Sequence, residues 1–83
     1  MTYTVVLIRE EDGRYSVVVP ALNNLATFGN TMPEAFHMAE EAILLYLEAI
    51  QDDGEPVPPD DPHVNVDMTE AAEAYVYKLA VDR

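Results

Sequence analysis

One stretch, residues 31–54, constrains the fold most, because it has the start and stop signals of a single long helix. Thr31 suits the N-cap position, Pro33 falls in the first turn where its missing N–H is harmless, and Glu34 stands where a capping box is completed. Gly54 supplies the stop. The sequence therefore predicts a helix over about residues 32–53, and the rest of the 83-residue chain is expected to pack against it.

Apolar residues cover more than one side of this helix. The predicted sheet-facing stripe consists of Ala35, Phe36, Ala39, Ala42, Ile43, Tyr46, Ala49 and Ile50, which recur at helical spacing. Outside that stripe lie Met38, Leu44, Leu45 and Leu47. A small protein can hardly bury every side of its one helix, so the surplus apolar side indicates a second chain. We expect Leu44, Leu45 and Leu47 to form an oligomer interface.

Two apolar runs before the helix have the pattern of a β-hairpin. Residues 3–8 and 15–19 are rich in β-branched and aromatic side chains, and Glu11-Asp12-Gly13 between them favours a turn. Pro20 is expected to close the second strand, and Asn23-Asn24 to form a turn before a short strand around residues 25–28. Both faces of the two long strands are apolar, so a covering layer is expected on each side.

The segment after the helix is harder to assign. Residues 55–62 form an acidic, proline-rich connector, after which Val64 and Val66 could pair briefly. Residues 69–74 favour a helix by propensity, whereas residues 75–81 alternate as a strand does, and we predict a final strand there. The predicted fold class is α+β: a single domain over residues 1–83, in which a two-layer βββαβ arrangement packs an antiparallel sheet on one long helix.

Composition narrows the function classes. The net charge is −12, and no lysine or arginine occurs between Arg14 and Lys78, so direct binding of nucleic acid is not expected. The same charge favours a basic partner, although a role in solubility alone explains it equally well. Small size without cysteine favours a homodimer or higher oligomer, since disulfides are excluded. The sequence has no membrane-spanning run and no signal peptide, so we expect a cytoplasmic protein.

Residue types that could carry chemistry are few and scattered. The candidates are His37 beside Glu40 and Glu41, His63, the pairs Asp52-Asp53 and Asp60-Asp61, and Ser16. None has the spacing of a zinc site, a calcium loop or a nucleophile elbow. A two-metal nuclease would need carboxylates that converge from several elements, and these strands are apolar. We therefore predict no catalytic residue, no metal site and no cofactor.

An ordered set of short motifs resembles the HicB antitoxin family. The motifs are Val19-Pro20-Ala21-Leu22, Gly29-Asn30-Thr31, Glu34-Ala35, Glu41-Ala42 and Gly54-Glu55-Pro56-Val57-Pro58. The resemblance covers about residues 3–58, and residues 75–82 are similar to the family's last strand. Two features depart from it: Asn23-Asn24-Leu25 replaces the frequent Pro-Gly-Cys, and no C-terminal DNA-binding module follows. Autorepression by this chain alone is therefore not expected.

The resemblance implies a degraded ribonuclease H-like domain without nuclease activity. It also implies a partner: HicA, a small basic RNA-cleaving toxin that the antitoxin neutralises by covering its surface. Two groups of acids are equally eligible to contact such a toxin, namely Glu10, Glu11 and Asp12 in the hairpin turn and Asp52, Asp53 and Glu55 after the helix. The alternative is an orphan HicB-like oligomerising domain without a toxin.

Overall fold

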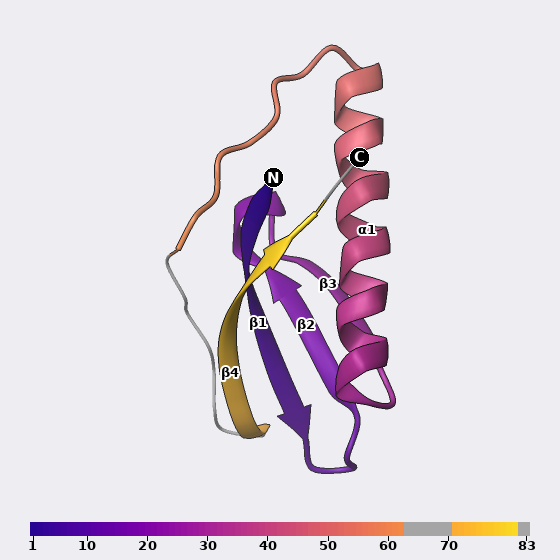
Figure 1. The fold of residues 1–83 in the computed structure, drawn as a ribbon, viewed down its shortest axis with the longest axis vertical. Coiled ribbons are helices and arrows are strands. Elements are labelled where there is room, and N and C mark those ends of the chain that lie inside the picture. Colours follow the sequence, from indigo (N-terminus) through magenta and orange to yellow (C-terminus); the bar gives the residue numbers. More distant parts are fainter. Residues whose placement is uncertain (63–70, 82–83) are drawn as a thin grey trace.

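The fold is a four-stranded antiparallel sheet with one helix on one of its faces (Figure 1). A computed structural model describes residues 1–62 and 71–81. The elements are β1 (Thr2–Glu10), β2 (Tyr15–Val19), a 3-10 turn η1 (Pro20–Leu22), β3 (Leu25–Gly29), α1 (Met32–Asp52) and β4 (Ala71–Ala80). The strands lie in the order β3-β2-β1-β4, so the predicted βββαβ fold is confirmed.

Turn chemistry places the first three strands. Gly13 has a positive φ of 91° in the β1–β2 turn, where the Gly13 N–H donates to the Glu10 carbonyl at 3.0 Å. Asn23 and Asn24 both adopt left-handed backbone geometry between η1 and β3, as asparagine tolerates. The hairpin and the Asn23-Asn24 turn are thus confirmed.

The caps of α1 also follow the sequence. Thr31 Oγ1 accepts the Glu34 N–H at 3.2 Å, while the Glu34 carboxylate accepts the N–H of Asn30, the residue before the cap. At the other end Gly54 has a φ of 77°, and the N–H groups of Gly54 and Glu55 donate to the Gln51 and Ile50 carbonyls. This is the Schellman arrangement that a glycine stop allows.

The core lies between the sheet and α1. The buried strand residues on this face are Tyr3, Val5, Leu7, Val17 and Val19, and the buried helix residues are Ala35, Ala39, Ile43 and Leu47. Gly29, at the end of β3, lets the two layers approach: a β-carbon there would lie 2.5 Å from the Ala35 nitrogen. The sheet-facing stripe was therefore right for Ala35, Ala39 and Ile43.

Two assignments on the helix were wrong. Leu47, predicted outside the stripe, is 0 % exposed in the core, whereas Ala49, predicted inside it, is exposed. The buried residues follow a strict four-residue spacing, which is a ridge inclined to the helix axis. An ideal helical wheel assumes a stripe that runs parallel to the axis. It therefore assigns residues in the last turns of the helix to the wrong side.

The last strand is longer than predicted. Residues 71–74, which favour a helix by propensity, belong to β4 and pair with β1 at positions such as Ile8 opposite Ala74. Pairing with a central strand overrides the weak helical preference of alanine and glutamate. His63, Val64, Val66 and residues 68–70 lie outside the described residues.

Candidate partner-binding surface

The acids of the β1–β2 turn lie beside an open hollow on the sheet. The hollow has a volume of about 650 Å³ and is lined by Glu10, Glu11, Asp12, Arg14, Ser16, Ala26, Thr27 and Phe28. Phe28 is 60 % exposed, although it is a large apolar side chain. The predicted turn acids are thus brought together with an aromatic ring that sequence reasoning had not singled out.

Hydrogen bonds shape the rim of this hollow. Ser16 Oγ donates to Glu10 Oε1 at 3.0 Å, and the Arg14 guanidinium contacts Asp12 Oδ2 at 2.8 Å. The Arg14 backbone N–H is the main reason that the pKa of Asp12 lies below its usual range; partial desolvation opposes it and the Arg14 guanidinium adds to it. Asp12 is therefore held in its ionised form at neutral pH. Glu11 is exposed.

The arrangement suits a cationic side chain. The Arg14 guanidinium carbon lies 6.0 Å from the centroid of the Phe28 ring, so the ring face already attracts a cation. A lysine or arginine from a partner could contact the same ring and the carboxylates of Glu10 and Glu11. Sequence reasoning missed Phe28 because it was assigned only to a short strand; its place near the hairpin acids depends on Ser16 pairing with Phe28 across β2 and β3.

The second group of acids lies at the other end of the molecule. Asp52, Asp53 and Glu55 are all exposed at the C-terminal end of α1, far from the β1–β2 turn (Figure 1). The structure thus does not bring the two predicted acidic groups together. A single small partner that contacts both would have to extend along the long axis of the domain.

The three leucines of the predicted oligomer interface differ in their exposure. Leu47 is a core residue, and Leu44 is half-buried and packs against the core. Leu45 is 67 % exposed and remains a candidate contact for a second chain. The exposed apolar surface of α1 is therefore smaller than the sequence indicates.

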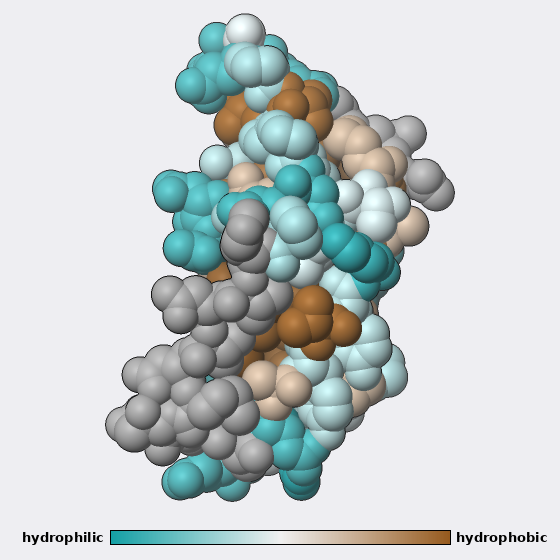
Figure 2. Space-filling model, turned by 90° about the vertical axis from the view of Figure 1, so that its left-hand side faces the viewer, coloured by the Kyte–Doolittle hydropathy of each residue, from teal (hydrophilic) through white to brown (hydrophobic). Residues whose placement is uncertain are grey.

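A second apolar surface lies on β4, at the edge of the sheet. Tyr75, Val76 and Tyr77 are 38 %, 54 % and 37 % exposed. Figure 2 views the molecule from the side where β4 lies and shows hydrophobic patches between hydrophilic side chains there. Sequence reasoning assigned these residues to a strand but did not identify it as an edge strand with exposed side chains.

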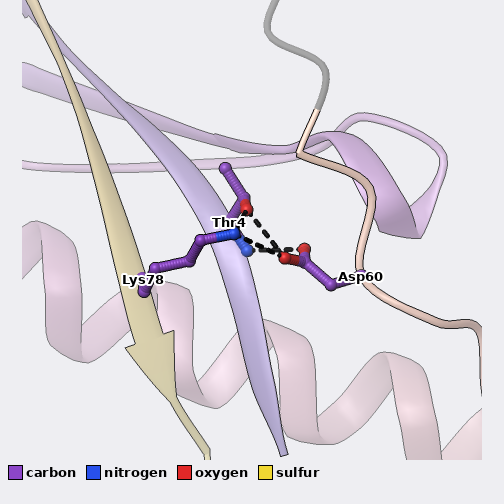
Figure 3. Close-up of polar contacts among 3 residues, drawn as sticks. All are labelled: Thr4, Asp60 and Lys78. Carbon is purple, nitrogen blue, oxygen red and sulfur yellow. Dashed lines mark hydrogen bonds and ion pairs between the residues drawn. The ribbon is translucent and has the colours of Figure 1, made fainter.

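Asp60 in the connector forms a clamp on the sheet (Figure 3). Its carboxylate accepts the Thr4 N–H at 2.7 Å, the Thr4 hydroxyl at 2.8 Å and the Lys78 ammonium at 2.9 Å. Lys78 also donates to Thr4 Oγ1 at 2.6 Å. The residues come from the connector, β1 and β4, and the sequence shows Asp60 only as one of two adjacent acids.

Opposing effects act on the pKa of Asp60. Desolvation raises this pKa, but the Thr4 N–H, the Lys78 ammonium and the Thr4 hydroxyl together have the larger effect. The net result is a pKa lowered to about 2. Asp60 is therefore ionised throughout the physiological range. Because Thr4 is only 1 % exposed, the clamp satisfies polar groups that water cannot reach.

Side chains that can bind a metal ion do not cluster in the described part of the chain. Within residues 1–62 and 71–81, no three His, Cys, Asp or Glu side chains lie close enough to hold a metal ion. The exposed His37 lies 3.9 Å from Glu41, a surface pair one helical turn apart. In the same described part of the chain, no helix is long and apolar enough to cross a membrane.

Comparisons with known proteins identify the family of this chain. A family model described as the HicB-like antitoxin of bacterial toxin-antitoxin systems matches residues 3–81. The chain belongs to the HicB-like antitoxin family. Membership supports an antitoxin role in general and indicates a binding protein.

Relatives are spread across archaea and bacteria. A UPF0150 protein of Thermoplasma acidophilum is 43 % identical over 61 residues, which cover 74 % of this chain and 88 % of that protein. A UPF0150 protein of Synechocystis is 41 % identical over 59 residues, covering 71 % of this chain and 75 % of its own.

A solved structure confirms the fold class. The crystal structure of the N-terminal domain of Burkholderia pseudomallei antitoxin HicB aligns over 100 % of both chains, with a TM-score of 0.73 and 22 % sequence identity. At that identity the likeness concerns the fold alone.

Proposed function

We propose that this protein neutralises a small, basic, HicA-like RNA-cleaving toxin by covering the toxin's surface in the cytoplasm. The observation that carries the proposal is the HicB-like family match over residues 3–81 of a chain whose net charge is −12. A toxin that cleaves RNA needs a basic surface to bind phosphates. An acidic protein that occupies this surface competes directly with the RNA.

The hollow beside the β1–β2 turn is the surface that best fits such a partner. It combines acidic side chains, which raise the rate of encounter with a basic protein, and the exposed ring of Phe28, whose burial stabilises a complex. A toxin lysine or arginine that enters the hollow would contact both. We assign the first contact with the toxin to Glu10, Glu11 and Phe28.

This protein contributes binding and no chemistry in this proposal. To neutralise a toxin by blocking its RNA-binding surface, the complex needs only a lifetime longer than the time between the toxin's encounters with RNA. Electrostatic attraction sets the association rate, and burial of apolar anchors sets the lifetime of the complex. The complex should therefore associate more slowly as salt increases, while its dissociation rate changes less.

The test starts from the adjacent genes: the proposal predicts that one of them encodes a small basic protein, which is then co-expressed with this one. The wild-type antitoxin should restore growth and co-purify with its neighbour. Phe28→Ala combined with Glu11→Gln should weaken the complex at least tenfold, because both the anchor and one charge are lost. A matched control, Glu48→Gln on the exposed side of α1, should bind as the wild type does.

The orphan domain is the competing hypothesis. It predicts that no basic neighbour co-purifies and that the purified protein changes no RNA cleavage. Exposed Leu45 and β4 would then serve self-association alone. Rescue of growth by the wild type, lost in the double variant and kept in the control, rejects the orphan hypothesis.

A further inference from the structure

The outer edge of β4 is the longest strand edge in the described part of the chain. β4 spans Ala71–Ala80 and pairs on one side with β1, from Thr2 opposite Ala80 to Glu10 opposite Ala71. In the strand order β3-β2-β1-β4, it has no second neighbour among the described residues. The opposite edge, β3, spans only Leu25–Gly29. Strands with such an edge present N–H and C=O groups that can pair with another chain.

Apolar side chains flank this edge on both faces of the sheet. Tyr75 and Tyr77 lie on the face that carries α1, where the Tyr77 ring meets Phe36 edge-on with centroids 5.1 Å apart. Val76 lies on the opposite face and is 54 % exposed. The two tyrosine rings are neighbours, with centroids 6.4 Å apart. A strand added to β4 would cover apolar surface on both faces.

The usual protection of an edge strand is weak here. Proline, an inward charge, a bulge or a free lysine discourages pairing between edges. The one lysine of β4, Lys78, is bonded to Thr4 and Asp60 across the sheet. The β1–β4 register is irregular where Arg9 pairs with Glu73 and Glu10 with Ala71, so β4 carries a bulge near its start. From Ala74 to Ala80 the register is regular, and only this part of β4 offers a regular edge.

We propose that β4 pairs antiparallel with β4 of a second copy, so that one continuous sheet runs through a homodimer. The distribution of charge along the chain favours a second copy, rather than a basic partner, as the strand that pairs with β4. The chain carries 16 acidic and 4 basic residues, yet residues 74–81 contain no acid and one lysine. Two copies with a charge of −12 each repel least where this segment meets itself, whereas a basic toxin is drawn to the acidic ends.

The sequence Tyr75-Val76-Tyr77 is also self-complementary. A two-fold axis through Val76 places Tyr75 opposite Tyr77 of the second copy, and all four rings then share one face of the sheet. Aromatic pairs directly across two strands stabilise a sheet beyond backbone pairing. The same axis brings Val76 against Val76 of the second copy on the other face.

A single cysteine tests this axis. The chain has no cysteine, so Val76→Cys introduces one thiol. Directly opposed residues of antiparallel strands have Cα atoms about 4.5–5.5 Å apart, within the range that a disulfide spans. Under mild oxidation Val76→Cys should cross-link to a dimer of the wild-type size. Leu45→Cys, on the exposed side of α1, is the matched control and should remain monomeric after denaturation.

A charge at the same position gives an independent readout. Val76→Lys should raise the dimer dissociation constant at least tenfold in analytical ultracentrifugation, because two lysines would meet on the axis. Leu45→Glu should leave the dimer unchanged. Circular dichroism checks that both variants fold, as expected for side chains that are already exposed.

Three results would overturn the proposal: a monomeric wild type, a dimer broken by Leu45→Glu but kept by Val76→Lys, or loss of toxin binding in Val76→Lys with the dimer intact. The last would assign the edge of β4 to the toxin. The first two results do not depend on whether the toxin hypothesis holds, because the dimer is measured on the protein alone.

Discussion

Replacing Asp60 by alanine tests whether the connector is a structural part of the domain. The substitution removes the acceptor of the Thr4 N–H and the ion-pair partner of Lys78. Thr4 is 1 % exposed, so water cannot replace the lost bond to its N–H. The free energy of unfolding should therefore fall at neutral pH.

The magnitude follows from the pKa of Asp60. A carboxyl group whose pKa is about 2 when folded, against 3.8 ordinarily, contributes at most about 2.5 kcal/mol at neutral pH. The side chain is 24 % exposed, so solvent screening reduces this contribution. We expect a loss of about 2 kcal/mol, which lowers the melting temperature of a domain this size by roughly 10 °C.

The pH dependence has a definite sign. Because the folded pKa lies below the unfolded one, the contribution is present at neutral pH and is lost as the pH falls from about 4 toward about 2. Urea unfolding at several pH values should show the wild type and Asp60→Ala converging in this range. Glu55→Gln, which removes a charge from the same connector at an exposed position, should stay within about 0.5 kcal/mol of the wild type.

Two results would refute this reasoning. The first is an Asp60→Ala variant that is as stable at neutral pH as Glu55→Gln. The second is a stability difference that does not shrink on acidification, which would mean that the ionised carboxylate is not the source of the effect.

Three further substitutions test the packing of α1, each by urea unfolding. Gly29→Ala should lower the free energy of unfolding by about 2 kcal/mol or more, because its β-carbon would collide with the first turn of α1. Gly13→Ala should lower it by only about 1 kcal/mol, because its β-carbon would contact no atom and the cost comes from the positive φ at that position. Leu47→Ala should cost about 2–5 kcal/mol and Leu45→Ala less than about 0.5, and equal losses would contradict the placement of Leu47 in the core. Thr31→Ala should cost about 1 kcal/mol, and no loss would show that its hydroxyl does not cap α1.

Local chemistry explains why the elements could be predicted from sequence. The caps at Thr31 and Gly54, the turn at Gly13 and the apolar runs of β1 and β2 each act within a few residues of their own position. The helix bounds were therefore predicted to within one residue. Such signals need no knowledge of what the element packs against.

The errors concern features that arise only when distant segments meet. Leu47 is buried because α1 crosses the sheet along an inclined ridge, which no helical wheel shows. Residues 71–74 form a strand because β1 pairs with them. Asp60 meets Thr4 and Lys78 only because the connector crosses the sheet at that point.

Some features of the candidate surface could be predicted from the sequence and others could not, for the same reason. The hairpin acids were predicted from charge, and the structure places them beside a hollow. Phe28 and the edge of β4 were not recognised, because exposure depends on strand order. Strand order was predicted only as a meander followed by a last strand of unknown pairing.

The most direct test of toxin neutralisation is RNA cleavage by the small basic protein that the proposal predicts in an adjacent gene, measured while this protein is added. The account predicts that cleavage stops when this protein reaches a stoichiometric amount, and that Phe28→Ala with Glu11→Gln shifts the required concentration at least tenfold. Cleavage that persists in a large excess of folded wild-type protein would contradict the account.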